Sequence, residues 1–410
     1  MRVLEVSEHY FPHVGGISEH VYCLSRELIR KGHEVEVLTS RIPGKVPEDV
    51  PSVRIGRGVS LPINKSFSRI TLGVGIWSRI NHLLRRKRYD VIHIHGSLAP
   101  MLPMAALHYS RNDKKRTVAV GTFHAGHDPS SLYRIFKQPL HRQFFRYYDG
   151  LIAVSPVAKD TMSCFFPGDY RIIPNGVDTK VFSPGRSALA DRLPPSSLKL
   201  LFLGRFEPKK GLRYLLSAMS VIKRRVPDVR LVIVGGGPLK RYYRQFISPE
   251  VEDSIYFAGE VIGAERAEYY RWCDLSITPS IGAESFGITL LEAMGCAKPV
   301  VASDIPAFRY VMSEKEGIFV KPRDHADLAR GVLDLARRRT DWKRVGKAGR
   351  RKALGYSWKR IAGMVEDYYQ EVRIRRGIVK KDSQVPIVRS FVRGDRRSKG
   401  QKEHIDVHHT

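Results

Sequence analysis

The sequence predicts an α/β protein with two doubly wound domains that face each other across a cleft. Two observations predict it: short apolar strands alternate with helices along most of the chain, and a Pro- and Ser-containing segment at 184–197 separates two such series. With 410 residues, each domain can bury its own core. We expect domains at 1–183 and 184–355, a crossing helix at 356–372 and a disordered basic tail at 373–410.

The first series opens with a strand, a glycine-rich turn and a helix, as doubly wound sheets do. We expect the strand at 2–7 and the helix at 17–31, ended by Gly32. Between them, Gly15 and Gly16 let the backbone approach a ligand closely, although paired glycines also occur for steric reasons alone. The other elements expected in this half are strands at 34–39, 90–95, 117–122, 151–155 and 171–173, a basic helix at 77–86 and an irregular segment at 53–69.

Histidines mark two of these strands. His93 and His95 share one side of the strand at 90–95, and we interpret them as core histidines because no acid or cysteine accompanies them at metal-ligand spacing. His124 follows the strand at 117–122, at the carboxyl edge where ligands of such sheets bind. It is therefore the better candidate for contact with a substrate.

The second series repeats the pattern. We expect a helix at 212–225 and strands at 199–203, 230–234, 255–258 and 275–278. Arg205 and Lys210 flank its first strand-to-helix turn, where two cations can neutralise a diphosphate. The alternative is plain surface charge, which is common in so basic a chain.

The sequence predicts a loop, a helix and a strand over the segment 278–304. Glu284 lies just before the helix and Glu292 about two turns into it, so both carboxylates can reach one ligand. The amides of Phe286, Gly287 and Ile288 are unpaired at the helix start, which favours an anion such as a diphosphate. The alternative is an ordinary α/β unit in which Glu284 caps the helix and Glu292 lies on a solvated face.

A formal net charge of +29 shows that the surface attracts anions, whether nucleic acid, acidic lipid or a phosphorylated substrate. A nucleic-acid binder is disfavoured because no zinc, helix-turn-helix or RNA-recognition signature is present. The basic, aromatic segment at 132–148 can lie on an anionic membrane or pack in the core with a solvated basic side. The sequence favours the core-packing alternative somewhat.

The chain shows the features of a cytoplasmic protein. The start at Met1 reads as a strand rather than a signal peptide, and the apolar segment 91–109 carries histidines and prolines that argue against a membrane span. Four cysteines lie far apart without metal-ligand spacing, so we expect reduced core thiols; they are Cys23, Cys164, Cys273 and Cys296.

With these motifs, the chain resembles glycosyltransferase family 4. The members of this family are retaining enzymes with two facing Rossmann-like domains, which is called the GT-B architecture. The resemblance extends from Met1 to about Val372. The motifs that carry the likeness to the family are Gly15–Gly16, the strand with His93 and His95, Thr122-Phe-His124, Pro174-Asn-Gly-Val-Asp178, Gly204-Arg205 with Lys210-Gly211, Gly235 to Pro238, and Glu284 and Glu292 separated by seven residues. Within the family, the chain looks most like the phosphatidylinositol mannosyltransferases, on the residues Pro62-Ile-Asn-Lys-Ser-Phe-Ser-Arg69, Glu284-Ser-Phe-Gly-Ile288 and Ser303-Asp-Ile-Pro-Ala-Phe-Arg309.

The resemblance implies retaining transfer of a hexosyl group, mannose from GDP-mannose, to a lipid-linked, phosphatidylinositol-like acceptor. It implies no cofactor and no metal, and an enzyme that is peripheral on the inner face of the cell membrane. The implied catalytic residues are His124, Arg205, Lys210 and Glu284. The implied donor contacts are Gly15, Gly16, Arg205, Lys210, Gly237, Ser285, Phe286, Gly287, Ile288 and Glu292, and the implied acceptor contacts are Asn64, Ser66 and Arg69.

Some residues depart from the pattern of these relatives. Ala283 stands where they often carry a second glycine, and Ser18 and the segment 126–129 lack polar or lysine residues that they use near the acceptor. A UDP-sugar, or a soluble acceptor such as a sugar phosphate or another polyol, is therefore the alternative.

Overall fold

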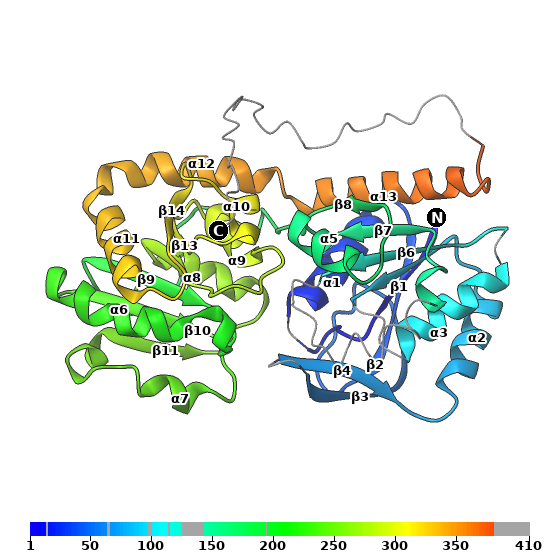
Figure 1. Cartoon of the computed structure of the whole chain (residues 1–410), viewed down its shortest axis with the longest axis horizontal. Helices are drawn as coiled ribbons and strands as arrows, with labels where there is room; N and C mark the ends of the chain where they lie inside the picture. The colour runs from blue at the N-terminus through cyan, green and yellow to red at the C-terminus, as the bar shows by residue number, and fades with distance from the viewer. Residues whose placement is uncertain are drawn as a thin grey trace, which may run out of the picture.

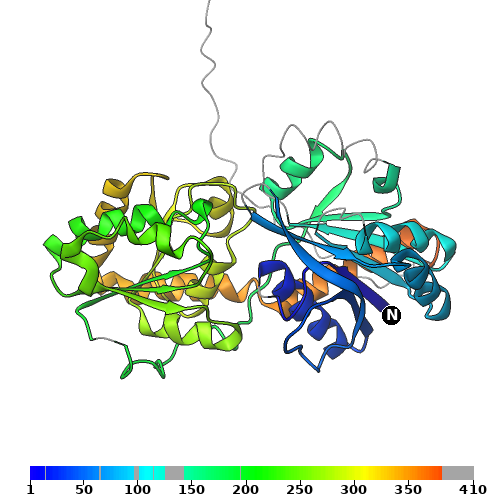
Figure 2. The same cartoon turned by 90° about the horizontal axis from the view of Figure 1, so that it is seen from below.

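A computed structural model shows two α/β lobes that lie side by side in both views (Figures 1 and 2). It describes residues 1–13, 15–63, 66–96, 101–113, 115–124, 143–193 and 195–380, without the side chains of 60–69. We call the lobe built on the first sheet the N lobe and the other the C lobe. This arrangement confirms the predicted fold class of two doubly wound domains.

The N lobe is built on an eight-stranded sheet with strand order β4-β3-β2-β1-β5-β6-β7-β8. All neighbouring pairs in it are parallel except the β3–β4 hairpin at one edge. Its main elements are β1 Arg2–Ser7, α1 Gly16–Arg30, β2 Glu34–Arg41, β3 Ser52–Ile63, β4 Ser66–Leu72, α2 Ile76–Arg86, β5 Val91–His95, α3 Leu102–Tyr109, β6 Val118–Phe123, β7 Gly150–Ala153, α5 Pro156–Ser163 and β8 Tyr170–Ile172.

The C lobe is built on a six-stranded parallel sheet with strand order β11-β10-β9-β12-β13-β14. Its main elements are β9 Leu198–Leu203, α6 Leu212–Arg225, β10 Val229–Val234, α7 Lys240–Arg244, β11 Ile255–Gly259, α8 Arg266–Trp272, β12 Leu275–Thr278, α9 Ile288–Gly295, β13 Val300–Ser303, α10 Pro306–Val311, β14 Gly317–Val320, α11 His325–Arg337 and α12 Trp342–Leu354.

The two lobes share an apolar core at the side where they touch. Phe123 and Tyr170 of the N lobe belong to the same buried cluster as Phe286 and Phe308 of the C lobe. Nearby, α5 contacts α10, and the Ser155 hydroxyl donates a hydrogen bond of 2.5 Å to the carbonyl oxygen of Ser285. Apolar burial therefore joins the lobes along one side and leaves the carboxyl edges of the two sheets facing each other.

The chain crosses back from the C lobe to the N lobe after α12. The last helix, α13 Trp358–Arg375, lies over the N lobe in Figure 1. Its apolar stripe includes Ile361, Val365 and Tyr369, which pack in one cluster with Val3 of β1. The helix continues three residues beyond the predicted boundary at 372, and residues 381–410 of the expected tail lie outside the described part of the chain.

Two expectations from the sequence were wrong. The described residues of the segment 53–69 are not irregular, because they lie in β3 and β4, which pair in antiparallel register. The cysteines are not all core thiols either: all four are free, but Cys164 is exposed and Cys23 is only partly buried. Of the segment 132–148, residues 132–142 lie outside the described residues, while Phe144 and Tyr148 pack against buried clusters.

Candidate functional site

A cleft of about 890 Å³ opens between the lobes. The N lobe lines it with the loop after β1, the start of α1 and the end of β6, while the C lobe contributes the turns after β9 and β10 and the loop before α9. These segments all follow carboxyl ends of parallel strands, the edge at which open α/β sheets bind ligands. The cleft is thus where a substrate can contact both lobes.

The cleft brings together most of the residues that the sequence singled out. They are Gly15, Gly16, His124, Arg205, Lys210, Glu284, Ser285, Phe286, Gly287, Ile288 and Glu292. Gly237 does not line it, whereas its neighbours Gly235 and Gly236 do. Asn64 lies outside the described residues, and of Ser66 and Arg69 only the backbone, in β4, is described.

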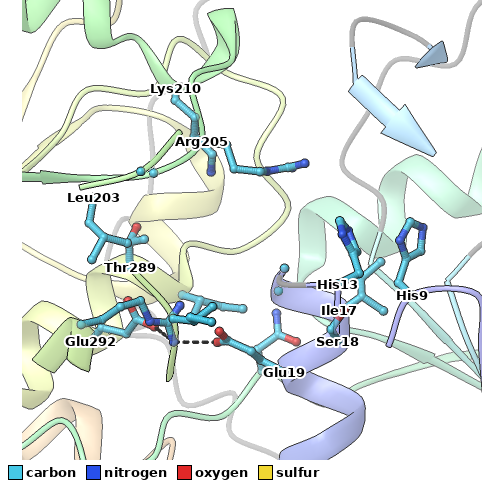
Figure 3. Close-up of a pocket in the computed structure, with 18 of the residues that line it drawn as sticks. His9, His13, Ile17, Ser18, Glu19, Leu203, Arg205, Lys210, Thr289 and Glu292 are labelled. Carbon is cyan, nitrogen blue, oxygen red and sulfur yellow. Dashed lines mark hydrogen bonds and ion pairs between the residues drawn. The ribbon is translucent and has the colours of Figure 1, made fainter. Parts of the chain in front are cut away.

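The turn after β9 places two cations at the cleft (Figure 3). Arg205 is about half exposed and is held by Glu207, with 2.9 Å between Nη1 and Oε1. Lys210 donates a hydrogen bond of 2.7 Å from Nζ to Oε1 of Glu284, which also accepts one from the Ser280 hydroxyl at 3.1 Å. This hydrogen bond fixes the turn after β9 to the loop before α9, although Lys210 and Glu284 are 74 residues apart in sequence.

The side chain of Glu284 is only 11% exposed, and this burial by itself favours the neutral acid. Lys210 and Lys209 outweigh this burial and lower the pKa of Glu284 below its ordinary value. Glu284 is therefore ionised at neutral pH and presents a fixed negative charge beside the two cations. Because it is paired with Lys210, it does not cap the helix that follows: Gly287 stands at the N-cap of α9, without a side-chain cap.

Gly211 makes this turn possible. Its φ of +70° is unfavourable for other residues, and a Cβ there would lie 1.8 Å from the carbonyl oxygen of Pro279. We expect Gly211→Ala to lower the free energy of unfolding by roughly 1–3 kcal/mol, because backbone must shift to make room. Denaturant titration measures this. Gly32→Ala, which shares the positive φ but meets nothing within 4 Å, is the control for the backbone effect alone.

Glu292 projects from α9 at the opposite end of the C-lobe wall and is almost completely buried, 1% exposed. It is therefore not on a solvated face. Its Oε2 accepts a hydrogen bond of 3.0 Å from the Tyr270 hydroxyl, and its Oε1 lies 3.0 Å from Nη2 of Arg266. Burial raises the pKa of Glu292 to about 7, while the Arg266 charge opposes the shift.

The floor of the N-lobe side is a buried histidine cluster that the sequence only partly revealed. His20 of α1 packs edge-on against His124, with ring centroids 4.7 Å apart. His20 donates from Nδ1 to Oδ1 of Asn175 at 2.8 Å, and His95 donates from Nε2 to Glu5. Each of the three rings keeps a buried nitrogen without a partner: Nε2 of His20, Nδ1 of His95 and Nε2 of His124.

Burial keeps these rings neutral, since it lowers the pKa of His20 to about 3 and of His95 to about 4. Among the described residues, two sets of three groups place ligand atoms within 4.8 Å of one another, which is compatible with a metal ion; they are His20, His95, His124 and Glu5, His93, His95. Glu5 and His20 were not among the site residues predicted from the sequence. Glu5 faces His93 across the β1–β5 ladder, a pairing that only the sheet order reveals.

Residues 14–181 of the chain match the family described as Glycosyltransferase Family 4, and residues 197–338 match Glycosyl transferases group 1. The chain is 32% identical over 381 residues to a phosphatidyl-myo-inositol mannosyltransferase of Mycobacterium tuberculosis, an alignment that covers 91% of this chain and 97% of the relative. The chain belongs to glycosyltransferase family 4. It is a hexosyltransferase.

Solved structures support the GT-B fold of this glycosyltransferase. Sucrose-phosphate synthase from Thermosynechococcus elongatus superposes with a TM-score of 0.72 at 20% identity, covering 91% of this chain and 99% of that one. HepE of Anabaena, in complex with UDP-glucose, superposes with a TM-score of 0.69 at 16% identity, covering 90% and 100%. No described helix of the family 4 enzyme combines the length and apolar character needed to cross a membrane.

Proposed function

We propose that the enzyme transfers mannose from GDP-mannose to a phosphatidylinositol-like acceptor, with retention at the anomeric carbon. One observation carries the proposal: two cations beside an ionised Glu284 and the buried carboxylate of Glu292 line one cleft, whose other wall holds Gly15, Gly16 and His124. The name of the mycobacterial relative supports the choice of sugar and acceptor. The donor would lie along the C-lobe wall, with the ribose of its nucleoside at Glu292, and the acceptor would enter from the N lobe.

The chemistry needs charge neutralisation at the departing diphosphate. Arg205 and Lys210 line the cleft and would meet the developing negative charge, and cationic groups held in place before the reaction cost no reorganisation. Gly16 lines the cleft from the other lobe, so its backbone can approach the same phosphates. With these groups the transfer would proceed without a metal ion at the diphosphate.

Retention can be reached without a covalent enzyme intermediate. Glu284 would contact hydroxyls of the transferred sugar, because both Lys210 and Ser280 already hold its Oε1 and leave Oε2 for a ligand. The acceptor hydroxyl would attack from the face that the diphosphate leaves, through an oxocarbenium-like state, and pass its proton to the departing phosphate oxygen. The bond to the acceptor forms as the bond to the diphosphate breaks, which conserves the configuration.

His124 would contact the transferred sugar from the N-lobe side. It lines the cleft, and its packing against His20, whose ring is held by Asn175, fixes where it lies. Burial and the neighbouring histidines keep its pKa well below the ordinary value, so it offers a neutral imidazole to a hydroxyl. A neutral ring binds a sugar hydroxyl without adding charge near the oxocarbenium-like centre.

A panel of nucleotide sugars tests the proposal. We expect GDP-mannose to raise the melting temperature by several degrees, UDP-glucose to raise it less, and mannose transfer to phosphatidylinositol vesicles to continue in the presence of a chelator. Inositol phosphate as the acceptor distinguishes a soluble substrate from the lipid. Stabilisation by UDP-sugars alone would show that the donor is a UDP-sugar, and loss of transfer with the chelator would contradict the proposed metal-independent reaction.

A further inference from the structure

The two lobes are linked at the cleft by an ion pair that the proposed function does not use. Glu19 of α1 in the N lobe receives a hydrogen bond of 2.8 Å from Nη2 of Arg266, the first residue of α8 in the C lobe. The two residues are 247 positions apart, and both line the cleft. Figure 3 shows Glu19 reaching from α1 toward the C lobe, with Glu292 beyond it.

This pair is not an ordinary surface contact. The side chains of Arg266 and Glu19 are 13% and 18% exposed, so water and salt screen their attraction far less than that of an exposed pair. Arg266 also lies over the ring of Phe182, in the segment that connects the lobes, at 5.5 Å from the centroid. Removal of one partner therefore leaves a largely desolvated charge without its partner from the other lobe.

The same guanidinium nitrogen holds the carboxylate that the proposed function assigns to the donor ribose. Nη2 of Arg266 lies 3.0 Å from Oε1 of Glu292, so two carboxylates, one from each lobe, share one cationic atom. The Tyr270 hydroxyl holds the other oxygen of Glu292. Any movement that opens the cleft at Glu19 thus removes one of the two anions that fix Arg266, and leaves the guanidinium to Glu292 alone.

From this arrangement we infer that Arg266 is a positioning residue that couples the donor site to closure of the two lobes, with Glu19 as its anchor on the N lobe. The closed state keeps Glu292 oriented by Arg266 and Tyr270 and keeps the cleft walls at the spacing that the donor bridges. In the open state the anchor is lost. A nucleotide that contacts Glu292 and the N-lobe glycines binds the closed state better and shifts the population toward it.

The inference rests on the proposed function for the identity of the ligand, whereas the effect of the ion pair on lobe closure can be measured without one. Small-angle X-ray scattering of the free protein is the first measurement. We expect Glu19→Gln to have a larger radius of gyration than the parent at low salt. Equal radii for parent and variant at low salt would overturn the coupling to closure.

Calorimetry with GDP and steady-state kinetics with GDP-mannose are the second measurement. We expect Glu19→Gln to raise the Kd for GDP and the KM for the donor about 10-fold, while kcat at saturating donor falls less than threefold, because bound donor itself holds the lobes together. A Kd within twofold of the parent would contradict the inference. Failure of the parent to bind GDP would instead count against the proposed donor and leave the scattering result intact.

The matched control is Glu268→Gln, on the same helix as Arg266. Glu268 pairs with Arg271 within α8 at similar burial, with side chains 22% and 17% exposed, but makes no contact across the cleft in the described structure. We expect it to change neither the radius nor GDP binding. The double variant Glu19→Gln with Arg266→Gln should bind GDP within twofold of Arg266→Gln alone, because the two residues act through one contact. If the losses of GDP affinity in the two single variants instead added up in the double variant, Glu19 and Arg266 would act independently.

Discussion

Lys210→Ala is expected to lower kcat for mannose transfer about 100-fold or more, which corresponds to roughly 2.7 kcal/mol or more of lost transition-state stabilisation. Lys210 stands beside Arg205 at the cleft and pairs with Glu284, so its removal takes one of the charges available to the departing diphosphate. It also releases Glu284 from its only charged hydrogen-bond partner among the described contacts. Because diphosphate charge grows as the bond breaks, kcat should fall more than donor affinity.

Single-turnover rates at saturating GDP-mannose measure this loss, and calorimetry with GDP measures binding separately. Lys223→Ala is the control: this lysine pairs with Asp253 and does not line the cleft, so both quantities should stay within twofold. Turnover of Lys210→Ala close to that of the parent would remove Lys210 from leaving-group stabilisation. Equal losses in binding and rate would assign it to holding the donor instead.

The alternation of strands and helices was readable from the sequence because parallel strands buried on both faces are short apolar runs between helices with one apolar stripe. The helix 212–225 and the strand 275–278 have the predicted bounds in the structure. The β3–β4 pairing could not be predicted from the sequence. Gly56, Gly58 and Pro62 interrupt its pattern, and glycine and proline are ordinarily depleted in strands.

The candidate site was predictable to the extent that its residues follow strands. Arg205 and Lys210 follow β9, and Glu284 follows β12, so the adjacency of these strands in the sheet brings them to one edge. Contacts set by the packing of distant elements were not predictable. The pairing of Glu19 with Arg266 depends on how the two lobes meet, and no local pattern in either helix encodes that geometry.

Glu292→Gln is expected to raise the Kd for GDP-mannose roughly 10- to 100-fold, because hydrogen bonds from ribose hydroxyls to a carboxylate are stronger than those to a neutral amide. The structure makes the change conservative in shape. The amide is nearly isosteric and its oxygen can still accept from the Tyr270 hydroxyl, but its NH2 group cannot accept from Nη2 of Arg266. Calorimetry measures the loss of affinity, and the melting temperature of the free protein measures separately the loss of the buried pairing with Arg266.

The pH dependence of Glu292 gives the same prediction a sharper test. With its pKa raised to about 7 from an ordinary value of 4.5, the folded protein binds more protons than the unfolded chain between these two values. The free energy of unfolding should consequently fall as pH rises from about 4.5 to 7, and Glu292→Gln should remove that part of the slope.

Affinity for GDP-mannose should rise from pH 6 to pH 8 in the parent as the carboxylate ionises, and should stay flat in Glu292→Gln. Glu268→Gln serves as the control that retains the parent profile. An affinity profile of Glu292→Gln that still rises as in the parent would assign the titration to another group and withdraw Glu292 from the donor contact.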